Sequence, residues 1–73
     1  MKVYSVMIRD GFTFIESVFT DKAKAEARVR AIKNEWLEEA VGCDVDEHKN
    51  YCEITNCDGE SCAVWLAENE VEE

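Results

Sequence analysis

The sequence contains no proline, three glycines and one histidine among its 73 residues, and it has no internal repeat or linker-like stretch. A length of 73 residues supports one domain, which buries roughly 60% of its unfolded surface, and the missing repeat and linker agree with a single unit. Hydrophobic residues make up 47% of the chain, with two Trp, two Tyr and three Phe. Because disordered chains lack such a core inventory, we expect a folded domain.

Long hydrophobic runs are also missing. The apolar segment from Val3 to Ile8 is interrupted by Arg9 and Asp10, which makes it too short for a signal peptide or a membrane span. We therefore expect a cytoplasmic protein that makes no membrane contact. In that reducing compartment the four cysteines are expected to be free thiols or metal ligands rather than disulfides.

Basic residues are nearly absent from the second half of the chain. Residues 1–33 carry seven Lys/Arg and four Asp/Glu, whereas residues 34–73 carry one Lys and thirteen Asp/Glu. Such a segment would repel phosphates, which argues against direct binding of nucleic acid. The imbalance favours either a basic protein partner or plain solubility.

Two β-type segments flank Asp10-Gly11 within residues 1–19, which predicts a hairpin with either a two-residue or a three-residue loop. Thr20 or Asp21 then caps a helix that is expected to run to about Val41 and to stop at Gly42. Its apolar stripe must cover a sheet. The residues of the stripe are Ala25, Val29, Ile32, Trp36 and Ala40, flanked by Leu37 and Val41.

Residues 43–50 are expected to be an acidic connector that leads into a second hairpin. A three-residue loop over residues 57–59, with Gly59 left-handed, would pair Tyr51 with Trp65 and Cys52 with Val64. The fold class predicted is α+β, a single domain over residues 1–67 with strand and helix order β-β-α-β-β. One helix covers one face of an antiparallel sheet, and residues 68–73 form an acidic C-terminal tail.

The cysteines permit three interpretations. A zinc cluster would use Cys43, His48, Cys52 and Cys57, although structural zinc sites usually place ligand pairs two to four residues apart. A Cys57–Cys62 disulfide is disfavoured by the reducing compartment. Packing of Cys52 and Cys62 in the core is the favoured interpretation, so neither a metal nor a cofactor is expected.

No catalytic arrangement is apparent, and we predict that the protein is not an enzyme. The charge around the cysteines is negative, which stabilises thiols rather than thiolates. Paired acids could act as a glycosidase dyad only in a cleft, for which a chain of this size has little room. No nucleophile, base and orienting group are recognisable together.

The acidic residues suggest a binding surface instead. Carboxylates spaced over a rigid scaffold can imitate a phosphate backbone and attract a basic groove, although acidic residues more commonly serve solubility alone. Trp65 is expected on the sheet beside Tyr51, where it could anchor an interface, whereas Trp36 is expected in the core. The predicted partner-binding residues are Glu35, Glu38, Glu39, Asp44, Asp46, Glu47, Glu53, Asp58, Glu60 and Trp65.

Three motifs carry a resemblance to known proteins: K-V-Y-x-V at residues 2–6, F-x-x-x-V-F-T at residues 14–20, and A-x-A-E-A at residues 23–27. With them the first forty residues look like short bacterial and bacteriophage ββα-type domains of unknown function, which implies an architecture rather than an activity. In outline, the small acidic chain is also similar to phage-encoded inhibitors of host defence, including anti-CRISPR proteins and DNA mimics.

The function predicted is therefore that of a non-enzymatic, phage-type inhibitor in the host cytoplasm. It would bind a basic, nucleic-acid-handling host protein through its acidic face. The alternatives are a small accessory domain that forms a homodimer through its sheet and a Cys/His zinc-binding module.

Overall fold

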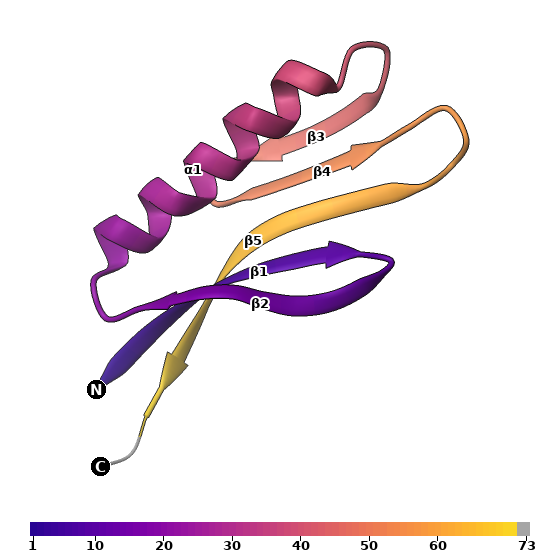
Figure 1. Cartoon of the computed structure of the whole chain (residues 1–73). Helices are drawn as coiled ribbons and strands as arrows, with labels where there is room; N and C mark the ends of the chain where they lie inside the picture. The colour runs from indigo at the N-terminus through magenta and orange to yellow at the C-terminus, as the bar shows by residue number, and fades with distance from the viewer. Residues whose placement is uncertain (72–73) are drawn as a thin grey trace.

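The computed structural model describes residues 1–71, which form one helix and a single five-stranded antiparallel sheet (Figure 1). The strand order across the sheet is β2-β1-β5-β4-β3. The predicted α+β class, with one helix on one face of an antiparallel sheet, is confirmed. The elements are β1 (Lys2–Asp10), β2 (Phe12–Phe19), α1 (Lys22–Glu39), β3 (Asp44–His48), β4 (Tyr51–Thr55) and β5 (Ser61–Glu70).

Strand β3 lies in the segment that was expected to be a connector, so that prediction was wrong and the order is β-β-α-β-β-β. All five residues of β3 are exposed, and Val45 is its one strongly apolar residue. The strand pairs with β4 alone, with Val45 opposite Ile54. An edge strand has a single neighbour and often carries charges, so it does not need the alternating apolar pattern that identifies an inner strand.

The β1–β2 hairpin turns at Gly11, whose φ of 77° lies in the left-handed region that favours glycine. The pairing of Arg9 with Thr13 corresponds to the three-residue loop. Further along, the register shifts at Glu16, which is an extra residue in β2. This bulge puts Phe14 and Phe19 on the same face although they are an odd number of residues apart.

Helix α1 begins after Asp21, whose side chain accepts hydrogen bonds from the backbone N–H groups of Ala23 and Lys24. The helix ends at Glu39, two residues before the expected end, and Gly42 follows with a φ of 81°. Val41 is therefore outside the helix and 90% exposed, so its expected place beside the apolar stripe was wrong.

The core lies between α1 and the covered face of the sheet. Val29 and Ile32 are the helix residues at its centre, and Trp36 packs at its margin. The buried sheet residues that they meet are Val6, Ile8, Cys52, Ile54 and Val64. The stripe that was predicted on the helix is the face that packs on the sheet.

The β4–β5 hairpin has the predicted register, including Tyr51 opposite Trp65 and Cys52 opposite Val64. Gly59 has a φ of 84°, and the Asn56 side chain accepts hydrogen bonds from two backbone N–H groups of the turn, at 3.0 and 3.1 Å. Strand β5 continues to Glu70, so residues 68–70 of the expected tail pair with β1. Residues 72 and 73 of that tail lie outside the described residues.

Candidate functional site

The acidic residues of β3 occupy one edge of the sheet. Asp44 and Asp46 pair with β4 residues of the uncovered face, Thr55 and Glu53, whereas Glu47 pairs with Cys52 of the covered face. Side chains alternate between faces along a strand, so these three carboxylates extend to both sides of the edge. We call Asp44, Asp46 and Glu47 the acidic edge.

A pocket of about 280 Å³ lies where the end of α1 meets the β1–β2 and β4–β5 turns. In Figure 1 both turns and the loop after α1 lie at the same end of the molecule. Three carboxylates line it, from Asp10, Glu39 and Glu60, and we call this the acidic pocket. Cys43 also lines it and precedes Asp44, so the pocket adjoins the start of the acidic edge. Its other lining residues are Trp36, Ala40, Ile54, Asn56, Ser61 and Cys62.

The remaining acids of the helix do not join the acidic edge. Glu35 is seven residues from Arg28, which places both on one side of the helix. Arg28 binds Glu16 of β2, so this side faces away from β3. Glu38 is exposed on the helix surface. Glu35 therefore does not join the acidic edge.

Two other predicted residues lie on the uncovered face of the sheet. The Glu53 carboxylate is 2.6 Å from Arg9 Nη2, which offsets its charge. Trp65 is partly buried between Met7 and Tyr51 on the neighbouring strands, and the Tyr51 ring lies 5.9 Å from that of His48. Asp58 is exposed in the β4–β5 turn. Of the predicted set, the structure thus brings Glu39, Asp44, Asp46, Glu47, Asp58 and Glu60 to one end and edge of the molecule.

Asp10 belongs to the acidic pocket but was assigned only to a turn from the sequence. It pairs with Cys62 across β1 and β5, two strands that are far apart in the chain. Only the adjacency of β1 and β5 could have indicated its place, and no local sequence pattern specifies that adjacency.

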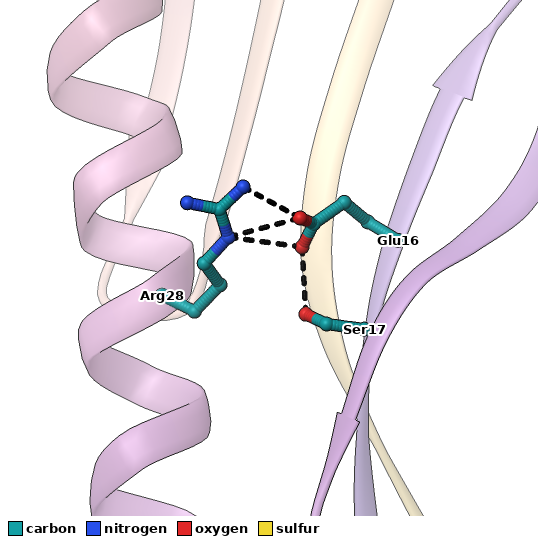
Figure 2. Close-up of polar contacts among 3 residues, drawn as sticks. All are labelled: Glu16, Ser17 and Arg28. Atoms are coloured by element: carbon teal, nitrogen blue, oxygen red, sulfur yellow. Dashed lines mark hydrogen bonds and ion pairs between the residues drawn. The ribbon is translucent and has the colours of Figure 1, made fainter.

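Ion pairs distinguish the acidic edge and pocket from other acids. Within residues 1–71, the only ion pair made by an acid of the acidic edge or the acidic pocket joins Asp46 to His48, with 3.0 Å between Oδ1 and Nε2. Four acids elsewhere are bound by basic residues, and the Glu16 pair is drawn in Figure 2. These pairs are Glu16 with Arg28, Glu26 with Lys49, Glu53 with Arg9, and Glu68 with Lys2. The edge and pocket therefore form a part of the described surface whose negative charge is largely unbalanced.

The four cysteines are free thiols. Burial is the main cause that raises the pKa of Cys52, and burial followed by the charge of Asp10 raises the pKa of Cys62. Both thiols are therefore protonated at neutral pH and are weak nucleophiles. Among the described residues, no group of three or more His, Cys, Asp or Glu is placed to hold a metal ion.

No helix within residues 1–71 has the length and the apolar character that crossing a membrane requires. Comparison with known proteins adds no assignment, because no protein-family model, curated protein or solved structure matches the chain. The functional argument therefore depends on the chain's own residues.

Proposed function

We propose that this is a non-enzymatic binding protein whose acidic edge and acidic pocket dock on a basic, nucleic-acid-binding surface of another protein. In this proposal it acts as a nucleic-acid mimic, as phage-encoded inhibitors of host defence such as anti-CRISPR proteins do. The observation that carries the proposal is the unbalanced charge of the edge and pocket, where Asp46 alone has an ion-pair partner among the described residues.

The dimensions of β3 support mimicry. A β-strand rises about 3.3 Å per residue, close to the roughly 3.4 Å of axis per phosphate along one strand of duplex DNA. Asp44 and Asp46, which share one face, therefore present carboxylates about two of these steps apart, and Glu47 presents a third on the other face. Because every residue of β3 is exposed, a partner can reach these carboxylates without a change in the fold.

Electrostatics would give such a surface two properties. Opposite charges speed the encounter between partners, and the interaction weakens as salt screens it. A charge that served solubility alone would lack a preferred partner surface. Selective, salt-sensitive capture of nucleic-acid-binding proteins is therefore the property to test.

The experiment is affinity capture from bacterial lysate on immobilised protein, with elution by rising salt and, separately, by duplex DNA or RNA. A variant with Asp44→Asn, Asp46→Asn and Glu47→Gln removes three charges from the edge and keeps side-chain size. A control with Glu35→Gln, Glu68→Gln and Glu70→Gln removes the same number of charges elsewhere.

The proposal predicts that the wild-type protein and the control capture the same nucleic-acid-binding protein, which nucleic acid elutes. The edge variant should lose it. Equal capture by both variants would show that position on the surface is irrelevant and would contradict the proposal.

A further inference from the structure

The two outer strands of the sheet, β2 and β3, leave different edges open (Figure 1). The bulge at Glu16 interrupts β2 where its register against β1 shifts. Strand β3 is regular, because its five residues pair one for one with those of β4. An added strand binds to an evenly spaced row of backbone groups, so β3 is the edge that can extend the sheet.

The outer side of β3 is open along its length. In an antiparallel pair, alternate residues direct their N–H and C=O groups toward the neighbouring strand, and the other residues direct them away from it. Within residues 1–71, β4 is the only strand beside β3, so the second set of backbone groups has no strand partner there. All five residues are exposed, and helix α1 packs mainly against β1, β2 and β5. A strand from another protein can therefore approach β3.

The side chains of β3 determine which strand fits there. Asp44 and Asp46 lie at alternate positions on the uncovered face, and the Asp46 side chain is 62% exposed. The one Lys or Arg after residue 33 is Lys49, whose Nζ atom lies 3.8 Å from Oε2 of Glu26 on the helix. Cross-strand pairs of opposite charge stabilise a sheet, and like charges directly opposite destabilise it. The edge therefore favours a strand with Lys or Arg at two alternate positions.

The covered side of β3 has a different character. Val45 is 42% exposed and pairs with the buried Ile54. Burial is the main cause that raises the pKa of Cys52, the charge of Glu47 raises it further, and the charge of Lys33 lowers it. A lysine of the helix thus lies on the same side as Glu47. A fitting strand needs an apolar residue opposite Val45 and no charge opposite Glu47.

We infer that β3 binds an extended basic segment of the partner protein as a sixth, antiparallel strand of the sheet. The segment carries Lys or Arg opposite Asp44 and Asp46 and an apolar residue opposite Val45. Its backbone supplies the hydrogen bonds that give affinity, and the two ion pairs fix its register. This inference rests on the proposed function, because it names the form in which the partner meets the acidic edge.

The same charges disfavour other strands. Charged side chains on an edge strand discourage indiscriminate pairing. A second copy of this chain is repelled by the formal net charge of −9, and two β3 strands side by side would bring their acids together. A neutral strand would take water from the two aspartates without supplying an opposite charge. A basic strand offsets this cost, so the edge discriminates between partners.

The test uses a labelled peptide with the central sequence Thr-Thr-Arg-Val-Arg, whose residues meet His48 to Asp44 in antiparallel order. Two further peptides keep this sequence and charge and carry two N-methyl groups each. In one the groups are on the two arginines, and in the other they are on the valine and the second threonine. An N-methyl group removes a hydrogen-bond donor, and only one of these alternate sets of amides faces β3.

Fluorescence anisotropy of the three peptides with the wild-type protein gives their affinities. One methylated peptide should bind about as well as the parent peptide, and the other should bind roughly tenfold less well, because two backbone hydrogen bonds are lost. In hydrogen-exchange NMR, alternate amides of β3 should gain protection when the parent peptide binds.

Variants of this protein test the charges. Asp44→Asn with Asp46→Asn should bind the parent peptide about tenfold less well, because both ion pairs are lost. The matched control, Glu35→Gln with Glu70→Gln, removes the same number of charges elsewhere and should bind it as the wild-type protein does. Circular dichroism shows whether each variant folds.

Three results would overturn the inference. Equal binding of the two methylated peptides would indicate an ionic contact without strand pairing, and unchanged binding by the aspartate variant would show that the edge is not the site. Failure of the parent peptide to bind a protein that still captures its partner would overturn the inference and leave the proposed function in place. Conversely, if the peptides behave as predicted but no nucleic-acid-binding protein is captured, the proposed function fails and strand addition is supported.

Discussion

Arg28 of the helix binds the carboxylate of Glu16 at the bulge in β2, with its Nη2 atom 2.5 Å from Oε1 and its Nε atom 3.0 Å from the same oxygen (Figure 2). The bulge is the point at which β2 changes register against β1, and Phe19, three residues later, packs against the core. This ion pair therefore ties the helix to the irregular edge strand.

A double-mutant cycle with Glu16→Gln and Arg28→Gln should give a coupling free energy of about 0.5–1 kcal/mol. We keep the value at the low end for a bidentate pair because the Arg28 side chain is 46% exposed and screened by solvent. Urea denaturation of the four proteins measures it. The Lys2–Glu68 pair, whose side chains are both about half exposed, is the control and should couple less strongly. Equal coupling free energies in the two pairs would contradict the role of the Glu16–Arg28 pair in holding the helix to β2.

The same pair predicts a pH dependence of stability. The hydrogen bond from Arg28 is the main cause that lowers the pKa of Glu16 below its usual value of 4.5. The unfolded chain then binds the proton more readily, so the stabilisation is fully present above the usual pKa and is lost as pH falls through the lowered folded value. Urea midpoints measured down to about pH 3 should fall less in Glu16→Gln than in the wild-type protein. If the urea midpoints of the two proteins fell by the same amount as the pH is lowered, the lowered pKa of Glu16 would be contradicted.

Core packing predicts opposite results for two valines. Val29 is fully buried in the helix–sheet core, so Val29→Ala should lower the free energy of unfolding by about 2 kcal/mol. Val41 is outside the helix and exposed, so Val41→Ala should leave it nearly unchanged. Thermal and urea denaturation measure both. If Val41→Ala lowered the free energy of unfolding by a similar amount, Val41 would have to pack beside the apolar stripe, as the sequence suggested, and its exposed position would be contradicted.

The thiols should differ in reactivity. Cys57 is exposed in the turn and should react first with iodoacetamide, followed by the partly buried Cys43 and Cys62. Cys52 should react last, because it is buried and burial raises the pKa of its thiol. Peptide mass spectrometry over a time course gives the order. Early modification of Cys52 in the folded protein would contradict its place in the core.

Much of the fold was predictable because local signals were strong. Gly59 and the alternation from Tyr51 to Leu66 predicted the β4–β5 register correctly, and the helix stripe identified the face that packs on the sheet. Strand β3 was missed because an exposed edge strand requires no apolar alternation. The sequence shows one sign of the bulge at Glu16. Phe14 and Phe19 are an odd number of residues apart, although both lie on the same face of the sheet.

The candidate site was predictable only in part. Composition showed that acids concentrate after residue 33, but which of them meet depends on the strand order and on the position along the helix. Glu35 and Glu39 are four residues apart and share one side of the helix, yet Glu39 in the last turn lines the acidic pocket whereas Glu35 lies nearer Arg28. Contacts between distant segments decide such placements.

The most direct test of the nucleic-acid mimicry is a competition experiment with the partner obtained by affinity capture. Fluorescence anisotropy of labelled duplex DNA or RNA bound to that partner is followed as this protein is added. The account predicts that the wild-type protein displaces the nucleic acid and that the variant with Asp44→Asn, Asp46→Asn and Glu47→Gln does so at least tenfold less well, about 1.4 kcal/mol. Binding of protein and nucleic acid to the partner at the same time would contradict it.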